Sequence, residues 1–375
     1  MKVMFVTNWM EMGGVETNIV LLTKEFTSLG HKVLVVSSGG VLDSDVHLNK
    51  GESSRIGIPS KNFFSSALKL KRIIQAWDPD IIHVFSACGA FYLWVAHKLL
   101  CGLGKRPPVV SSVMGLQNSP DESLFKTQLR NYLMTLGAGK ILIISPAIGK
   151  YLRKLPISGD RLIEKKVVGI RMPELLTDLE KLKVRKELMV GEEKIIITIG
   201  TLSPRKSHEL FIDAASKVLT VRKDVRFFIV GEGELRNFLE DRIATLGIQA
   251  NVHLLGMRKD VLRLLSVADI CVKPGIVEGF VGITVMEAQS LGVPVIAFDT
   301  IDVRLVIQDG VTGLIVPRSD IEKLADTIEM LLADKDVANK IGESGRIFIR
   351  STFSIAAVAE GLLSIYEDEV KSYLK

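Results

Sequence analysis

Short runs of apolar, mostly β-branched residues alternate with longer amphipathic segments along the whole chain, and this alternation restricts the fold more than any other feature. Nearly continuous apolar runs are typical of parallel strands that helices cover on both faces, so an α/β protein is predicted. Segment 16–29 has a helix-period apolar face and stops at Gly30, which makes a βαβ unit with the runs on either side. The strand candidates in the first half are residues 3–6, 33–37, 81–85, 109–113 and 141–144.

A second series of the same kind follows a charged stretch, residues 180–194, which has no β-branched run and is predicted to be the linker. We therefore expect two doubly wound domains, 1–175 and 190–350, whose strand ends face a cleft, because open α/β sheets bind ligands beyond the carboxyl ends of their strands. Residues 355–375 form an amphipathic pattern with no strand after it, and we expect them to pack across a domain surface. The strand candidates of the second series are 195–199, 226–230, 252–255, 270–272, 293–297 and 314–316, and its helix candidates are 207–219, 234–246, 261–268 and 284–290.

Composition excludes several other classes of protein. The chain has 375 residues, of which 47% are hydrophobic and 24% charged, and this excludes a disordered or collagen-like chain. Cys88, Cys101 and Cys271 are too few and too scattered for a disulfide framework or a zinc cluster, so a reducing cytoplasm is expected. The longest apolar stretch, 87–103, is interrupted by a histidine and a lysine and falls short of the roughly 18 residues of a spanning helix.

Basic residues are concentrated in the first half of the chain. Residues 1–170 contain 21 Lys and Arg against 12 Asp and Glu, whereas the remainder contains 27 against 31. An anionic acceptor or surface is therefore expected at the first half, and nucleic acid is not. Within it, segment 61–77 mixes Phe, Leu, Ile and Trp with Lys61, Lys69, Lys71 and Arg72. This segment is either a basic amphipathic helix on an anionic membrane or a core helix with a basic solvated face, and both interpretations stay open.

Glycines and cations stand at the ends of three strand candidates. Gly13 and Gly14 open the first helix without the GxGxxG spacing, and predict either amides that face an anion or a sugar hydroxyl, or a plain tight turn. Arg205 and Lys206 precede the next helix and can neutralise a diphosphate without a metal, although such a pair is also common in solvated turns. Gly231 either lets a ligand approach the end of its strand or makes a plain turn.

The most informative stretch is 278–288. Glu278 precedes a glycine-bearing loop, a helix begins near Ile283 or Thr284, and Glu287 lies about one turn into that helix. Backbone amides at the start of a helix suit a phosphate, while carboxylates accept hydrogen bonds from sugar hydroxyls. The alternative is one exposed loop acid and one exposed helix acid, but the helix around Glu287 is otherwise apolar.

Taken together, these motifs resemble one family, the retaining GT-B glycosyltransferases of the large family-four group, which use nucleotide sugars. The resemblance extends over nearly the whole chain. It rests on GGVE at 13–16, GHKV at 30–33, PDIIH at 79–83, GTLSPRK at 200–206, IVGEGE at 229–234, EGF and MEA within 278–288, LGVPVIA at 291–297 and DGVTGLIV at 309–316.

The resemblance implies a GT-B fold of two Rossmann-like domains, with the donor bound by the C-terminal domain, the acceptor bound by the N-terminal domain, and the last helix, 355–375, crossing back to the N-terminal domain. It implies that Glu278 faces the donor sugar, that Glu287 holds the ribose hydroxyls and that Lys206 contacts the diphosphate. Arg205 is expected beside Lys206, and the glycine pair 13–14 on the acceptor side. The further donor-binding residues are Phe280, Val281, Gly282, Ile283, Thr284, Gly231, Met257 and Arg258, with Gly256 at the base.

Three positions depart from the family pattern. Eight residues, not the usual seven, separate the two glutamates, so a bulge of one residue at Val281 is expected to return Glu278 to the site. The family's phosphate arginine is Thr201 here, and Arg205 is its expected substitute. The histidine that often ends the fourth strand is Met114, so that either Gln117 or Asn118 supplies a polar group or the activity is altered.

The expected reaction is transfer of a hexosyl group from a nucleoside diphosphate sugar to a hydroxyl of a glycan or lipid-linked acceptor, with retained anomeric configuration and with neither metal nor cofactor. The expected location is the cytoplasm, at the inner face of the membrane if segment 61–77 binds lipid. The alternatives are a nucleotide-sugar epimerase of the same fold and a non-catalytic protein that binds glycans or sugar nucleotides.

Overall fold

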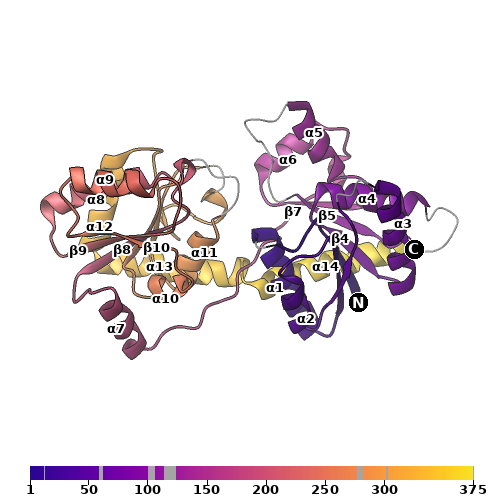
Figure 1. The fold of residues 1–375 in the computed structure, drawn as a ribbon, viewed down its shortest axis with the longest axis horizontal. Helices are drawn as coiled ribbons and strands as arrows, with labels where there is room; N and C mark the ends of the chain where they lie inside the picture. Colours follow the sequence, from indigo (N-terminus) through magenta and orange to yellow (C-terminus); the bar gives the residue numbers. More distant parts are fainter. Residues whose placement is uncertain are drawn as a thin grey trace. The chain divides into compact units, whose positions relative to one another are not determined.

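The chain forms two compact units in the computed structural model (Figure 1). The structure describes residues 1–11, 13–58, 62–99, 106–113, 124–276, 282–300 and 303–374. Unit 1 consists of Met1–Arg171 together with Phe353–Lys375, and unit 2 is the continuous segment Met172–Thr352. Each unit is built around its own parallel sheet.

Unit 1 contains a seven-stranded parallel sheet in the order β3-β2-β1-β4-β5-β6-β7. The five strands predicted from apolar runs are confirmed to within one residue at either end. The edge strands β3 and β7 were not predicted, because β3 is the polar sequence ESSR and β7 has three residues. The strands are β1 (Lys2–Val6), β2 (Lys32–Ser37), β3 (Glu52–Arg55), β4 (Ile81–Val84), β5 (Val109–Val113), β6 (Lys140–Ile143) and β7 (Leu162–Glu164).

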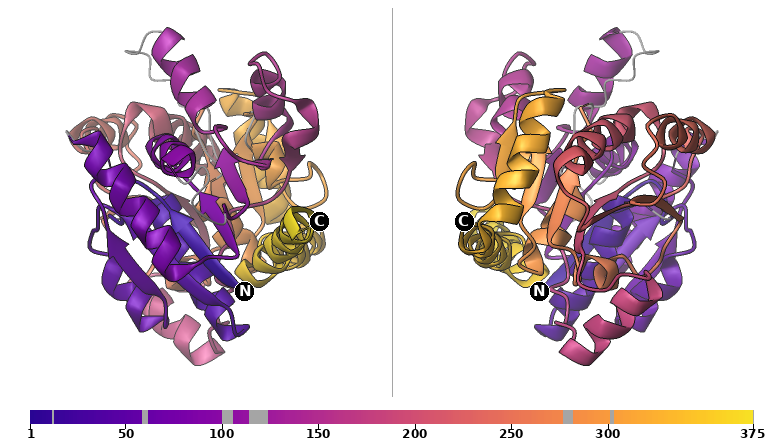
Figure 2. Two further views of the ribbon diagram at one scale, coloured as in Figure 1. Left: turned by 90° about the vertical axis from the view of Figure 1, so that its right-hand side faces the viewer. Right: turned by 90° about the vertical axis from the view of Figure 1, so that its left-hand side faces the viewer.

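Helices cover both faces of this sheet (Figure 2). On one face α1 packs against α2 and α14, and on the other α4 packs against α3 and α5. The helical segments of unit 1 are α1 (Gly14–Ser28), α2 (Asp43–Leu48), α3 (Phe63–Trp77), α4 (Ala87–Leu99), α5 (Leu124–Leu133), α6 (Pro146–Leu152), η1 (Gly159–Arg161) and α14 (Ile355–Leu374).

The last helix is held to the sheet of unit 1 by a buried chain of polar side chains. Tyr366 of α14 is fully buried, and its hydroxyl is hydrogen-bonded to Nδ1 of His83 on β4. The other ring nitrogen of His83, Nε2, lies 2.6 Å from the hydroxyl of Ser112 on β5. Burial lowers the pKa of His83 to about 3, so the imidazole is neutral at physiological pH. This network explains why the amphipathic C-terminal pattern packs on unit 1 and gives the histidine of the PDIIH motif a structural role.

Unit 2 contains a six-stranded parallel sheet in the order β10-β9-β8-β11-β12-β13. Its core lies between the sheet and the helices, with Phe211, Phe227 and Phe298 among the fully buried side chains. The helices α8, α9 and α12 pack together, as do α10, α11 and α13. The strands are β8 (Lys194–Ile199), β9 (Val225–Val230), β10 (Val252–Gly256), β11 (Ile270–Lys273), β12 (Val295–Phe298) and β13 (Leu314–Val316). The helical segments are α7 (Asp178–Glu187), η2 (Pro204–Lys206), α8 (His208–Val221), α9 (Arg236–Thr245), α10 (Val261–Leu265), α11 (Ile283–Ser290), η3 (Val303–Leu305), α12 (Ile321–Ala333) and α13 (Lys335–Thr352).

The charged stretch predicted to be the linker, residues 180–194, lies inside unit 2, and most of helix α7 falls within it. Helix α7 begins with a capping box, in which the Thr177 hydroxyl accepts from the Glu180 amide and the Glu180 carboxylate accepts from the Thr177 amide. Such a cap satisfies amides that the first helical turn leaves unpaired, so a highly charged segment is still helical. Within the described part of the chain, no helix is long and apolar enough to cross a membrane.

Candidate functional site

The carboxyl ends of β8, β9 and β10 are joined by backbone hydrogen bonds. The amide of Gly200 donates to the carbonyl of Val230 (2.9 Å), and the amide of Gly231 donates to the carbonyl of Gly256 (2.9 Å). A Cβ atom at Gly231 would lie 1.9 Å from the carbonyl oxygen of Gly200, and Gly231 has a φ of 152°. The space beside Gly231 is thus occupied by the protein's own backbone. This close approach accounts for the glycine by packing, in line with the plain-turn interpretation.

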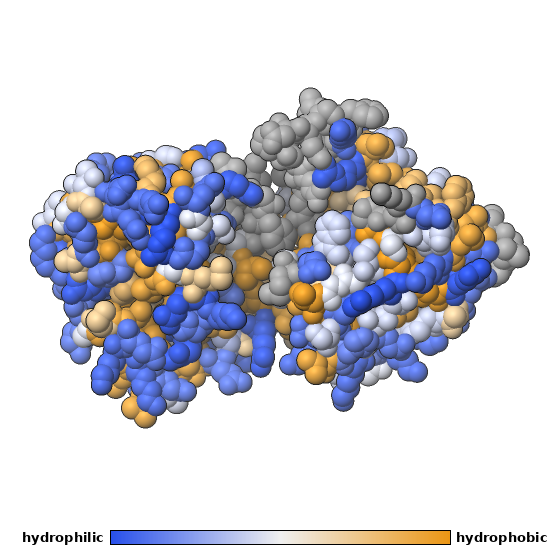
Figure 3. Space-filling model, viewed as in Figure 1, coloured by the Kyte–Doolittle hydropathy of each residue, from blue (hydrophilic) through white to orange (hydrophobic). Residues whose placement is uncertain are grey.

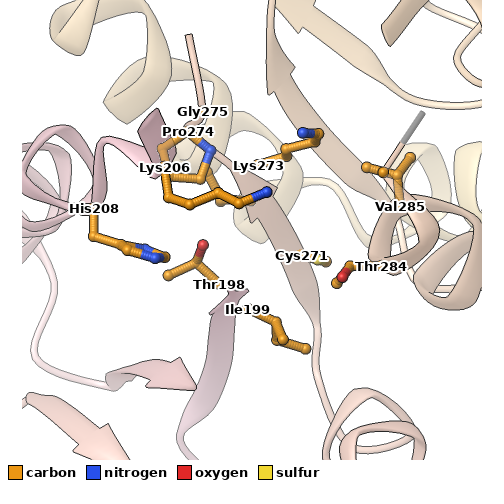
Figure 4. A pocket seen from close by; sticks show the side chains of 12 residues that line it. Thr198, Ile199, Lys206, His208, Cys271, Lys273, Pro274, Gly275, Thr284 and Val285 are labelled. Atoms are coloured by element: carbon orange, nitrogen blue, oxygen red, sulfur yellow. The ribbon is translucent and has the colours of Figure 1, made fainter. Parts of the chain in front are cut away.

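A pocket lies at the topological switch point of unit 2. The chain runs from β8 to β9 in one direction along the sheet and returns to place β11 on the other side of β8. In doubly wound sheets, ligands bind beyond the carboxyl ends of the strands at this point. The pocket is lined by the ends of β8 and β11, by the start of α8 and by the start of α11 (Figure 4). Its volume of about 30 Å³ has room for a small polar group, since about 10–15 Å³ of this kind of volume holds one water molecule.

The turn after β8 brings only one of the two adjacent predicted cations, Arg205 and Lys206, to the pocket. Lys206 ends the short helix η2 and lines the pocket, and His208 begins α8 beside it. Between them Ser207 adopts a left-handed conformation (φ 50°), which changes the chain direction. Arg205 is exposed and is not one of the lining residues. Lys206 therefore lies beside the first amides of α8, where the positive end of the helix dipole favours an anionic ligand.

Helix α11 brings its first turn to the same pocket. Gly282 is the residue before the helix, and Gly282, Thr284 and Val285 line the pocket, while Ile283 is the first helical residue. The first amides of a helix have no partner within it, so this turn can donate hydrogen bonds to an anion. Glu278, Phe280 and Val281 lie outside the described residues, and so does the bulge predicted at Val281.

Glu287 lies half-buried about one turn into α11, where burial raises the pKa of its carboxyl group. Its charge also acts on Cys271 of β11, whose thiol pKa is raised to about 12, first by burial and then by Glu287. Cys271 lines the pocket, whereas Glu287 is not one of the lining residues. A carboxylate in partly apolar surroundings gains from hydroxyl donors such as those of a ribose.

Among the lining residues that were not predicted, three have polar side chains: Lys273, Thr198 and His208. Lys273 is a cation at the carboxyl end of an apolar run, which is the same signal that identified Lys206. Thr198 is a hydroxyl inside the apolar run of β8. Both signals are visible in the sequence, but only the pairing of β8 with β11 brings the two side chains to one pocket.

The turn after β10, where the base is expected, presents a different arrangement. The side chain of Met257 is 76% exposed. The guanidinium of Arg258 forms two hydrogen bonds with the carboxylate of Asp260, at 2.8 and 2.7 Å, and lowers the pKa of that carboxyl. Arg258 is thus held in place by its neighbour, while Met257 is the residue that offers an exposed apolar surface.

At the start of α1 in unit 1, a carboxylate stands beside the glycine pair. Gly13 precedes the helix and Gly14 is its first residue. A Cβ atom at Gly13 would lie 2.3 Å from Oε2 of Glu16, and burial raises the pKa of Glu16. A carboxylate here disfavours a phosphate at this turn and leaves it suited to neutral hydroxyls. Met114, Gln117 and Asn118 lie outside the described residues.

Comparisons with known proteins give a consistent result over the two halves of the chain. Residues 12–163 match the model of the family described as Glycosyltransferase Family 4, and residues 180–348 match that described as Glycosyl transferases group 1. The chain is 26% identical over 194 residues to an alpha-D-kanosaminyltransferase of Streptomyces kanamyceticus, covering 51% of this chain and 50% of the relative. It is 32% identical over 202 residues to a GDP-mannose-dependent monoacylated alpha-(1-6)-phosphatidylinositol monomannoside mannosyltransferase of Corynebacterium glutamicum, covering 52% of each.

The chain spans about half the length of these two relatives. Among solved structures it is similar to HepE of Anabaena in complex with UDP, with a TM-score of 0.85 and 17% identity over 98% of this chain and 100% of that one. The predicted fold class, two Rossmann-like α/β units of the GT-B type, is confirmed.

Proposed function

Because the chain belongs to the group 1 glycosyltransferases, we propose that it transfers a hexosyl group from a nucleoside diphosphate sugar to an acceptor hydroxyl, with retained configuration and without a metal ion. One observation carries the proposal: Lys206 and the starts of α8 and α11 converge on a pocket at the switch point of unit 2. HepE, which shares the fold, binds UDP in a solved structure.

In this proposal the protein acts mainly by electrostatic stabilisation of the leaving diphosphate. Lys206 and the amides at the two helix starts take up the charge that develops on the diphosphate as the bond to the sugar breaks. A lysine in this position replaces a divalent cation as the counter-charge. Glu287 accepts hydrogen bonds from the ribose, and Glu278 faces the sugar, as the family resemblance implies. Retention rests on the same resemblance of the 278–288 stretch.

The donor proposal is tested by thermal shift with nucleoside diphosphates and their sugars. The donor's own nucleoside diphosphate is expected to raise the melting temperature, because a ligand that binds only the folded state stabilises it by mass action. Turnover with the matching sugar nucleotide is expected to be lost in Glu278→Ala and Lys206→Ala, with folding unchanged by circular dichroism. Unaltered turnover in both variants would contradict the roles proposed for Glu278 and Lys206. Sugar conversion without any acceptor would indicate an epimerase.

We further propose that unit 1 takes a glycan or lipid-linked acceptor at the cytoplasmic face of a membrane, through α3. The corynebacterial relative is named for a phosphatidylinositol mannoside. Leu70 and Ile74 of α3 are buried, which agrees with a core helix, but Phe64 and Leu68 are 66% and 41% exposed. Exposed basic residues share the helix with them. Over α3 and α4, hydrophobic and hydrophilic side chains lie next to one another (Figure 3). An amphipathic helix with this composition binds anionic lipid surfaces.

Co-sedimentation with anionic vesicles at low salt tests the membrane proposal. The protein is expected to pellet with the vesicles, and a Phe64→Ser, Leu68→Ser double variant to pellet much less. The matched control is Leu179→Ser, Leu182→Ser on α7, where both leucines are also exposed (65% and 63%). If the wild-type protein stays in the supernatant, or the control loses binding equally, α3 is not a membrane surface.

A further inference from the structure

Among the described residues that line the proposed diphosphate subsite, the turn after β8 contributes one lysine and the end of β11 contributes another. The family's phosphate arginine is Thr201 in this chain, and both Thr201 and Arg205 are exposed and absent from the pocket lining. Lys206 is the cation that this turn contributes. A diphosphate carries at least two negative charges, and charge-assisted hydrogen bonds are the strong contacts that anionic ligands make.

We propose that Lys273 of β11 and Thr198 of β8 contact the diphosphate of the donor, Lys273 as the second cation and Thr198 as a hydroxyl donor. The inference rests on the proposed function and deepens it. The two residues come from the two neighbouring strands at the switch point, so the diphosphate is held from both sides of it.

Lys273 is positioned for this role by the sheet and by α11. It is the last residue of β11, pairs with Ala297 of β12, and follows Cys271, which pairs with Ile197 of β8. Its side chain is half-buried and lines the pocket with Lys206 (Figure 4). Two lysines thus reach one small subsite, Lys206 from the turn after β8 and Lys273 from the end of β11.

A glycine makes the room that the Lys273 side chain occupies. A Cβ atom at Gly282 would lie 2.9 Å from Cε of Lys273, and Gly282 is the residue that precedes α11. The lysine stem therefore lies against the start of the helix, and its ammonium group is near the first amides of α11. A cation and helix amides at one place form an anion site.

The second, independent observation is the hydroxyl of Thr198. The residue is 1% exposed and lines the pocket, and its Oγ1 has no hydrogen-bond partner among the residues that the structure describes. Buried polar side-chain atoms are nearly always hydrogen-bonded, because an unpaired one keeps the full cost of leaving water. Valine has the same shape and would fill the position without that cost. The hydroxyl is accounted for by a phosphate oxygen that accepts a hydrogen bond from it when the donor binds.

The test compares a nucleoside diphosphate with its nucleoside by isothermal titration calorimetry, using the nucleotide that stabilises the wild-type protein. Lys273→Gln is expected to weaken binding of the diphosphate about 10- to 100-fold, the range for a hydrogen bond to a charged group, and to leave nucleoside binding unchanged. Thr198→Val is expected to weaken the diphosphate about 3- to 10-fold and to raise the melting temperature of the unliganded protein. The charge-matched control is Lys340→Gln, an exposed lysine of α13.

A further variant, Gly282→Ala, displaces Lys273 without removing its charge and is expected to weaken the diphosphate selectively as well. Unchanged diphosphate affinity in Lys273→Gln and Thr198→Val would overturn the inference, and so would an equal loss for diphosphate and nucleoside. If Lys273→Gln does not fold, the outcomes of Thr198→Val and Gly282→Ala decide. A wild-type protein that binds no nucleoside diphosphate contradicts the proposed function itself, whereas wild-type binding that ignores these substitutions contradicts this inference alone.

Discussion

Replacing Gly231 by alanine would put a methyl group where the carbonyl oxygen of Gly200 lies. The Cβ atom would be 1.9 Å from that oxygen, and the backbone of Gly231 has a φ of 152°. Because the colliding atom belongs to the backbone, no rotamer change relieves the contact, and the turn after β8 must move. Gly247→Ala is the matched control in the same unit, since Gly247 also has a positive φ (67°) but nothing within 4 Å of its Cβ position.

The two substitutions are expected to differ in their free energy of unfolding mainly because Gly231→Ala disturbs backbone hydrogen bonds around the turn after β8. Gly247→Ala costs about 1–2 kcal/mol for a side chain in the left-handed region, and Gly231→Ala costs at least as much, because a φ of 152° lies outside that region and is nearly restricted to glycine. In both variants the less flexible unfolded chain offsets about 0.4–1 kcal/mol of this cost. Gly231→Ala also strains three bonds: Gly200 to Val230, Gly231 to Gly256 and Leu202 to Glu232. At about 0.5–1.5 kcal/mol each, the extra loss is about 2–4 kcal/mol.

Urea denaturation followed by far-UV circular dichroism measures this difference directly. Gly231→Ala is expected to unfold at a much lower urea concentration than Gly247→Ala, with a similar slope. Equal midpoints for the two variants would refute the reasoning, because the Gly200 carbonyl would then not restrict the position. A Gly231→Ala protein of wild-type stability that no longer binds nucleotide would return Gly231 to the role of a ligand-contact glycine.

Two further predictions concern buried titratable groups. Burial holds the pKa of His83 at about 3 in the folded protein, against about 6.5 in the unfolded chain. Between these two values the unfolded state binds a proton that the folded state does not. The contribution of His83 to stability is therefore full above about pH 6.5 and is lost as the pH falls toward 3. Between about pH 7 and pH 5 the wild-type protein is expected to lose about 2 kcal/mol more than His83→Gln, measured by urea midpoints; parallel pH profiles would contradict this. Cys271 has a thiol pKa of about 12 and is expected to stay unlabelled by maleimide at about pH 8, while the half-buried Cys88 reacts. Mass spectrometry measures the labelling of each cysteine. Equal labelling of the two would show that the pocket opens far enough to admit the reagent to Cys271.

The interior of the fold was predictable because buried parallel strands consist of nearly continuous runs of apolar residues. Such a run is absent where a strand is stabilised by pairing with its neighbour and not by burial. Glu52 and Ser53 of β3 are paired with Leu34 and Val35 of β2, yet the segment reads as a loop. In segment 180–194, the many charges obscured helix α7, whose start is fixed by the capping box at Thr177.

The candidate site was predictable only in part, because sequence order does not state which strands become neighbours. Arg205 and Lys206 are equivalent by sequence, but the turn of η2 leaves the first exposed and brings the second to the pocket. Lys273 is far from both along the chain and joins Lys206 through the pairing of β11 with β8. At Gly231 the sequence indicated that another group approaches the backbone closely, but this group is the backbone of Gly200 and not a ligand.

The chain's last helix gives the two units different histories during synthesis. Unit 2 is one continuous segment, so it is complete as soon as residue 352 has left the ribosome. Unit 1 begins before unit 2, but the fully buried Tyr366, which contacts His83 and packs beside Phe26, is made only after all of unit 2. Domains usually fold in the order in which they are made. Here unit 1 is started before unit 2 but finished after it, and a nascent or truncated chain that lacks α14 exposes part of the core of unit 1.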